Sequence, residues 1–248
     1  MEELLQQIID HKRIKIKREK EAVGMQTLLA LGGERLNRQT HSLCEALSAS
    51  PHGLIASFRR KSLFTQGMRS NISINDVVAD YEKKEVAACS IPTDYALFGG
   101  SWSDLKRARQ QTHLPLLHND LFLDTYQLFQ SKVMGADAIV LRASALSPDE
   151  CQILTDTAHS LQLEVMLLIE EASALSYIDS SIDMVGLSLH PAELLQNEAF
   201  SSLFTACPSP GSTPMLVCMC ETILPNELPS LRAMGFRGVL MNLTNDNH

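Results

Sequence analysis

Short apolar runs alternate with amphipathic segments along most of the chain. Runs typical of strands lie at 53–58, 87–91, 114–118, 137–143, 164–169, 183–189, 214–219 and 238–242. Segments with the apolar spacing of helices lie between them, at 74–84, 101–111, 122–134, 147–161, 171–178, 192–206 and 224–234. Buried strands that alternate with helices indicate a parallel sheet, and eight of them predict a closed (β/α)8 barrel of the TIM-barrel type.

Residues at the segment ends support this alternation. Ser147 precedes Pro148 at the start of segment 147–161, where serine suits the N-cap and proline the first turn. Gly135 and Gly235 follow segments 122–134 and 224–234, where helices commonly end in a left-handed residue. We therefore expect helices to begin and end at these points.

The first 52 residues precede the first strand. We expect them to form a helical extension to a barrel over 53–243, within a single domain spanning 1–248. The opening helix, about 2–20, has one apolar stripe and many cations. We expect most of its cations to face solvent, as charges on amphipathic helices usually do. They are Lys12, Arg13, Lys15, Lys17, Arg18 and Lys20.

The last strand is not followed by a helix. Only six residues come after Asn242, too few for the helix that completes such a barrel. Strand 238–242 and helices 74–84 and 224–234 should then expose apolar surface, which usually meets a partner. We expect a homodimer or other oligomer through this seam; the alternative is a truncated, functionless gene product.

Composition narrows the classes of partner and compartment. The net charge is -8, with a pI of about 5.5, which argues against nucleic acid and anionic membranes as partners. The sequence has no apolar run of the length of a membrane span and no signal-peptide core, so we expect a cytoplasmic protein. The six cysteines suggest reduced thiols and no disulfide framework.

The stretch "GLIASFRRKSLFTQG" (53–67) ends a predicted strand in three consecutive cations, Arg59, Arg60 and Lys61, followed by Ser62. Cations at the end of a barrel strand are well placed to bind phosphate. A solvated basic loop is an equally good interpretation, so the residues leave both alternatives open.

Several stretches together resemble one family. They include "HKRIKIKREK", "LIASFRRKS", "FGGSWSDL", "GADAIVLRASAL" and "AMGFRGVLMN", in this order along the chain. They are similar to indole-3-glycerol-phosphate synthase, over about residues 5–243. The resemblance implies a barrel enzyme of tryptophan biosynthesis that cyclises, decarboxylates and dehydrates a carboxyphenylamino-deoxyribulose phosphate. Such a reaction uses lysines and carboxylates held close together in a dry pocket.

The positions that match the family's site have mostly lost their ionisable groups. The family's glutamate and lysine on strand one fall at Ser57 and Arg59, and its general-acid lysine on strand three falls at Asn119. Arginine holds its proton far above neutral pH and is a poor proton donor. The remaining matched site positions, on strands five to seven, are Leu168, Ser188, His190, Met219 and Cys220.

The family's phosphate positions are also degraded. They match Arg59, Ser62, Glu221 and Asn242, and Glu221 stands where the family has a glycine. A carboxylate there would repel a phosphate dianion, and a side chain would block close approach to the backbone. We therefore expect any phosphate binding to be weakened.

These losses favour a catalytically inactive or strongly impaired relative, a pseudoenzyme that binds an anionic or phosphorylated small molecule or a protein partner. Losing one catalytic group costs about 10²–10⁴ in rate. The first alternative is an active synthase that uses the substituted groups.

The second alternative is a different barrel enzyme built on Arg59, Glu170 and His190, the only potentially charged groups that strand parity turns toward the pocket. We expect no cofactor and no metal. His190 and Glu170 with Cys218 or Cys220 would form the best metal set, but parity with Met219 turns both cysteines away from the centre.

Overall fold

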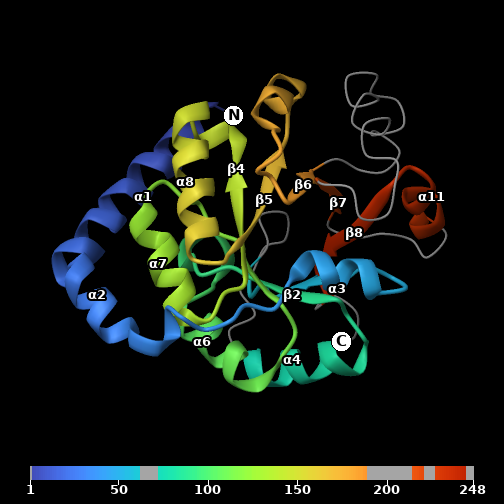
Figure 1. Ribbon diagram of the computed structural model, residues 1–248, viewed down its shortest axis with the longest axis horizontal. Coiled ribbons are helices and arrows are strands. Elements are labelled where there is room, and N and C mark those ends of the chain that lie inside the picture. The colour runs from blue at the N-terminus through green and yellow to red at the C-terminus, as the bar shows by residue number, and fades with distance from the viewer. Residues whose placement is uncertain (1, 62–71, 189–213, 221–226, 244–248) are drawn as a thin grey trace.

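The computed structural model describes residues 2–61, 72–188, 214–220 and 227–243 of the 248-residue chain. All its strands are parallel and pair in chain order, and β8 pairs with β1 to close the barrel. This confirms the predicted (β/α)8 architecture (Figure 1). The strands are β1 (Leu54–Ser57), β2 (Ala88–Ile91), β3 (Leu116–His118), β4 (Ala138–Arg142), β5 (Glu164–Ile169), β6 (Met184–Leu187), β7 (Met215–Met219) and β8 (Phe236–Met241).

Helices surround the barrel and extend it at the N-terminus (Figure 1). The extension contains α1 (Glu2–Ala22), α2 (Met25–Gly32), the 3-10 helix η1 (Gly33–Arg35) and α3 (Leu43–Ala49). The barrel helices are α4 (Ile74–Lys83), α5 (Tyr95–Phe98), α6 (Trp102–Gln111), α7 (Thr125–Met134), α8 (Pro148–Ser160) and α11 (Glu227–Ala233), with 3-10 helices η2 (Ala143–Ala145) and η3 (Ala172–Tyr177).

The predicted helix ends are confirmed at three places. Ser147 caps α8, and its hydroxyl and the side chain of Glu150 form a reciprocal capping box, with Pro148 in the first turn. Gly135 ends α7 at φ 103°, and Gly235 follows α11 at φ 99°. These local signals fixed the positions of the elements well.

Two predicted helices have a different outcome. Segment 171–178 is wrong as an α-helix, because it forms the 3-10 helix η3. There the hydroxyl of Ser176 donates to the carbonyl of Ser173, and side-chain bonding of this kind competes with α-helical bonding. Segment 192–206 lies outside the described residues.

Alternate strand residues face two separate cores. In β4, Ala138 and Val140 face the barrel interior, and Ile139 and Leu141 pack under the surrounding helices. Helix α3 closes the N-terminal end of the interior with Leu43 and Leu47, both fully buried. The open end of the barrel is therefore the C-terminal end of the strands, where barrel enzymes hold their sites.

Helix α1 lies along the outside of α7 and α8 (Figure 1). Its cations were expected to face solvent, and this is wrong for Lys12, which is only 5% exposed. Lys12 is buried because it reaches two carboxylates in the loops after β2 and β3, Asp94 and Asp120. A helix pattern alone does not reveal partners so distant in the sequence.

The predicted apolar seam is absent from the described residues. Their exposed large apolar side chains lie on α1, α2, α5 and α8. On β8 and α11, Val239 and Leu231 are buried. The observation on which the predicted assembly depended is therefore missing there, although the assembly itself stays a prediction. Across the described residues we find no helix with the length and apolar content that a membrane span requires.

Candidate functional site

A cavity of about 280 Å³ opens at the C-terminal ends of the strands. We call it the mouth pocket. Its polar lining comes from Arg59, Asn119, Arg142, Glu170, Ser188 and Cys220, and its apolar lining from Pro92, Phe98, Leu168, Met219 and Leu240. Most of these residues lie at or just after the end of a strand, because parallel strands bring their carboxyl ends to one rim.

The structure brings together most of the predicted site positions that it describes. Seven residues of the predicted set line the mouth pocket: Arg59, Asn119, Leu168, Glu170, Ser188, Met219 and Cys220. Ser57 is buried below it, with its carbonyl accepting a hydrogen bond from Tyr81 at 3.0 Å, and Asn242 is also buried outside the lining. Ser62, His190 and Glu221 lie outside the described residues.

Three matched positions on the strand walls of the pocket carry no charge. Leu168 is 2% exposed and belongs to the barrel-interior core, with Met219 packed against it. Asn119 follows β3 on the opposite wall. An amide, an isobutyl group and a thioether do not ionise at neutral pH. These three side chains therefore supply no general acid or base to the pocket.

The three adjacent cations after β1 separate in space. Arg59 lines the mouth pocket, with its guanidinium carbon 6.0 Å from the ring centre of Phe98. Arg60 instead forms a two-pronged ion pair with Asp104, both N–O distances being 2.7 Å. Lys61 donates to the carbonyl of Ala96 at 2.9 Å. Of the three, only Arg59 is part of the lining of this pocket.

Arg142 was missed by the sequence analysis. It ends β4 beside Leu168 of β5, and it forms an ion pair with Glu170. The other oxygen of Glu170 accepts a hydrogen bond from Ser144 at 2.8 Å. The prediction that Arg59, Glu170 and His190 are the only chargeable pocket groups is therefore wrong. The charged residue that ends the run "AIVLR" was the available signal.

Cys218 of β7 and Cys220, just after β7, were both expected to turn away from the centre. Cys220 packs against the core under the helices, as Cys218 does, and it also lines the edge of the mouth pocket. Cys218 lies under the helices, and its hydrogen bond to Cys220, with burial, raises its pKa above the ordinary value. Within the described residues no three His, Cys, Asp or Glu side chains converge as a metal site would need.

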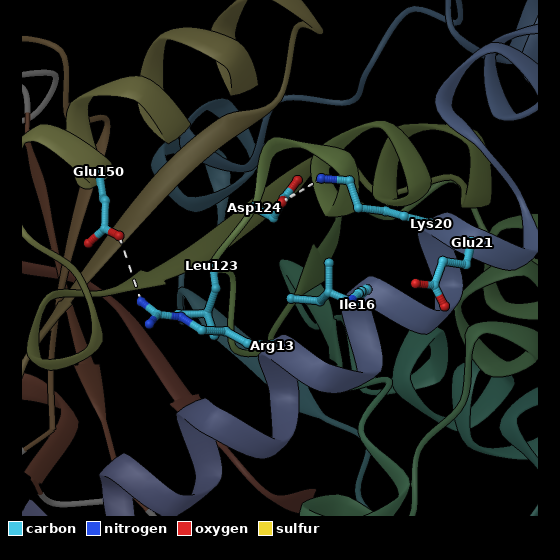
Figure 2. A pocket seen from close by; sticks show the side chains of 8 residues that line it. Arg13, Ile16, Lys20, Glu21, Leu123, Asp124 and Glu150 are labelled. Atoms are coloured by element: carbon cyan, nitrogen blue, oxygen red, sulfur yellow. Dashed lines mark hydrogen bonds and ion pairs between the residues drawn. The ribbon is translucent and has the colours of Figure 1, made fainter.

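A second cavity, of about 500 Å³, lies between α1 and the loops before α7 and α8. Figure 2 shows Arg13 reaching toward Glu150 and Lys20 reaching toward Asp124, at 3.8 and 2.7 Å. Lys17 and Glu21 complete a lining of three cations and three anions. This balanced, largely exposed charge suits the contact between extension and barrel better than a site for a charged ligand.

Comparisons with known proteins place the chain in a family. The sequence model described as Indole-3-glycerol phosphate synthase matches residues 5–186. A protein named indole-3-glycerol phosphate synthase from Bacteroides thetaiotaomicron is 35% identical over 98% of this chain and 93% of its own. Another of that name, from Prochlorococcus marinus strain MIT 9301, is 27% identical over 97% of this chain and 84% of its own.

Solved structures support the fold. The N-acetylmannosamine-6-phosphate 2-epimerase of Clostridium perfringens matches 83% of this chain and 91% of its own, with a TM-score of 0.60 and 13% identity. A mutant tryptophan synthase alpha-subunit of Pyrococcus furiosus matches 77% of this chain and 87% of its own, with a TM-score of 0.58 and 16% identity. The matches in sequence, which span most of the chain, go further: this chain belongs to the indole-3-glycerol phosphate synthase family.

Proposed function

We propose that this member of the family has lost, or nearly lost, the synthase reaction and works as a binding protein in the cytoplasm. The observation that supports this proposal is the set of residues that line the mouth pocket. Asn119, Leu168 and Met219 occupy matched positions of the family's general acid and glutamates, and none of them transfers a proton at neutral pH. None of the five described cysteines is in a disulfide, which suits a reducing compartment.

The charges that remain in the described lining do not replace the lost groups. Glu170 is held by Arg142 and Ser144, so its carboxylate is already committed on both oxygens. Arginine is a poor proton donor, so Arg59 does not replace a lysine acid. These contacts also count against a different enzyme built on Arg59, Glu170 and His190.

A direct assay tests the proposal. The purified chain is given carboxyphenylamino-deoxyribulose phosphate, and formation of indole-3-glycerol phosphate is followed beside the Bacteroides thetaiotaomicron protein as the control. We expect a rate at least about 10⁴-fold lower, since several groups worth about 10²–10⁴ each are missing, although such losses do not simply multiply. A rate within tenfold of the control, or normal growth of a synthase-deficient tryptophan auxotroph carrying this gene, would establish the alternative.

That alternative is an active synthase. The observation in its favour is the 35% identity, over nearly the whole of both chains, to a protein that carries the synthase name. The substitutions Asn119→Lys, Leu168→Glu and Met219→Glu, made together, refine the test. If the missing ionisable groups are the cause of inactivity, this variant should gain measurable turnover, provided that it folds.

The proposed ligand is a small anion held at Arg59. The support is the guanidinium of Arg59, which lines the mouth pocket beside the ring of Phe98. Thermal shift with inorganic phosphate and with benzoate should show stabilisation that Arg59→Gln removes and Lys61→Gln keeps. If neither anion stabilises the wild type, the partner is of another kind, and a protein partner or a second copy of the chain becomes the leading choice.

A further inference from the structure

A buried ionic cluster joins the N-terminal helix to the barrel next to the mouth pocket. The ammonium of Lys12 lies 2.6 Å from Oδ1 of Asp120 and 3.4 Å from Oδ2 of Asp94. Both carboxylates are also largely buried, and Lys15 approaches Asp94 more loosely, at 3.8 Å. Lys12 is thus the cation that brings two buried carboxylates from different loops together.

The cluster continues into the barrel through neutral groups. The hydroxyl of Thr93 donates to Oδ2 of Asp120 at 2.5 Å, and Nε2 of His118 lies 3.0 Å from the same hydroxyl. On its other side, Nδ1 of His118 lies 2.8 Å from the hydroxyl of Ser131 on α7. Each polar group therefore has a partner, as buried polar groups require.

The protonation of the cluster follows from its burial. Burial lowers the pKa of His118, which is fully buried, so its imidazole is neutral. The hydroxyl of Thr93 donates to Asp120, so it is left to accept from Nε2–H of His118, while the hydroxyl of Ser131 donates to the carbonyl of Gln127 at 2.7 Å. Burial alone would raise the pKa of Asp120, but His118 and the charge of Lys12 hold it far below its ordinary value. Asp120 is therefore an anion that depends on Lys12.

Two residues of the cluster are the sequence neighbours of residues that line the mouth pocket. Thr93 follows Pro92, and Asp120 follows Asn119; Pro92 and Asn119 both line the mouth pocket. Without the Lys12 charge, two buried carboxylates would face each other, and the loops that carry them would separate to hydrate them. The positions of Pro92 and Asn119 would change with those loops.

We propose that Lys12 is a positioning residue of the mouth pocket, which acts through Asp120 and Thr93 to fix Asn119 and Pro92 at its wall. The N-terminal helix then helps to hold the ligand site in shape, although it does not line the pocket. The proposal rests on the proposed function only in treating the mouth as a ligand site, and it holds whether or not any synthase activity remains.

The chain contains two kinds of reporter: a tryptophan for the charge of His118 and cysteines for the accessibility of the two barrel ends. Trp102, its single tryptophan, packs edge to face against His118 with ring centres 5.0 Å apart. A protonated imidazole in contact with an indole quenches its fluorescence, so Trp102 reports the charge of His118. Cys220 lines the mouth pocket, and Cys44 lies at the opposite end of the barrel near Glu164. The alkylation rates of these two thiols, measured by peptide mass spectrometry, compare the two ends.

The test compares Lys12→Met, Lys12→Arg and the exposed control Lys17→Met on the full chain. The charges around His118 are Asp120, Lys12 and Lys15, with Asp94 beside Lys12. Lys12→Met removes a cation that lowers the pKa of His118, so acid quenching of Trp102 should move to higher pH. Alkylation of Cys220 should rise at least about tenfold while that of Cys44 stays unchanged. The melting temperature should fall by about 10 °C.

Lys12→Arg should recover most of the wild-type behaviour, and Lys17→Met should match the wild type. If Lys12→Met lowers the melting temperature but leaves both the Cys220 rate and the Trp102 titration unchanged, Lys12 is only structural and the proposal is wrong. If Lys12→Met does not fold, Thr93→Val breaks the same chain of contacts while keeping the Lys12–Asp120 pair. An unchanged Cys220 rate in that variant would also overturn the proposal. Neither readout involves synthase turnover, so failure here leaves the proposed function standing.

Discussion

The closed end of the barrel and the strand walls of the mouth pocket treat buried charge in opposite ways. At the closed end, Asp137 is fully buried and accepts from Arg38 at 2.8 Å and from Arg109 at 2.7 Å. Nearby, Glu164 accepts from the backbone of Leu43, at the start of α3, at 2.8 Å. At the open end, the strand walls of the mouth pocket carry the neutral or apolar residues Asn119, Leu168 and Met219.

This difference follows from what each charge does for the folded state. A carboxylate at the closed end satisfies buried guanidinium and backbone donors, so its loss leaves them without an acceptor. An ionisable group held ready for catalysis stabilises a transition state and often costs stability in the resting protein. Once a reaction is no longer selected, the second kind can be replaced by apolar residues, whereas the first kind cannot.

The largest test of this contrast is Asp137→Ala. It leaves two arginines, 23% and 13% exposed, without their shared carboxylate. It also removes the acceptor of the backbone N–H of Leu116 in β3, at 2.9 Å. We expect a loss of about 3–5 kcal/mol in the free energy of unfolding, measured in urea. Asp156→Ala, an exposed position on α8, is the matched control and should change stability by less than about 0.5 kcal/mol. If Asp137→Ala lowers the free energy of unfolding by less than about 1 kcal/mol, the buried charge of the closed end is not needed for stability and the contrast with the mouth pocket is wrong.

The second test separates adjacent cations that the sequence groups together. Arg60 and Asp104 are 15% and 5% exposed, and their pairing joins the residues just after β1 to α6. Arg60→Gln should cost about 2–3 kcal/mol, and the exposed neighbour Lys61→Gln less than about 0.5 kcal/mol. Equal effects of the two substitutions would mean that the ion pair of Arg60 does not stabilise the fold.

The pH dependence of that second test has a definite sign. Burial alone would raise the pKa of Asp104, yet hydrogen bonds from Arg60 and Ser101 hold it below its ordinary value. A carboxyl whose folded pKa is lowered adds stability above its unfolded pKa of about 4, and this contribution is lost as the pH falls through the folded value. The stability gap between the wild type and Arg60→Gln should therefore narrow below about pH 4. A gap that is independent of pH would assign the effect to packing instead.

The fold was predictable because its signals are local. The alternation of segments gave each of the strands, and Ser147 and Gly135 marked helix ends correctly. The contacts that decide the site are not local. Lys12 lies 108 residues from Asp120, and Arg60 lies 44 residues from Asp104. No spacing in the sequence encodes such pairs. A helix pattern or a run of cations therefore could not show which charged residues stabilise the fold and which line the site.

Strand alternation located the mouth pocket but did not give all of its rim. Positions within strands, such as Leu168 and Met219, face the pocket as their parity predicts. Cys220 lies one residue beyond its strand and contacts both the core under the helices and the mouth pocket. The regular pleat ends with the ladder, and the loop backbone then sets each side-chain direction separately.

A third and smaller test asks whether the mouth still tolerates charge. Leu168→Glu restores a carboxylate beside Arg142, its neighbour in the β4–β5 register. We expect a cost of about 1–3 kcal/mol, because the carboxylate reaches an open cavity and a cation. Met166→Glu, two residues earlier in β5 and fully buried in the interior, should instead prevent folding. Similar costs for the two variants, measured by urea unfolding, would mean that the mouth has become ordinary core.

The smallest expected effect concerns Arg142 and Glu170, the charged pair that the mouth does contain. The two side chains are 30% and 34% exposed, so solvent screens their attraction. A double-mutant cycle with Arg142→Met and Glu170→Gln should give a coupling of about 0.5–1 kcal/mol in the free energy of unfolding, and less in high salt. A coupling above about 3 kcal/mol that persists in high salt would make this pair a structural anchor like those of Asp137. The mouth pocket would then contain a charged pair that stabilises the fold, as the closed end does. The neutral and apolar residues of its strand walls could no longer be explained by a general loss of charge at the mouth.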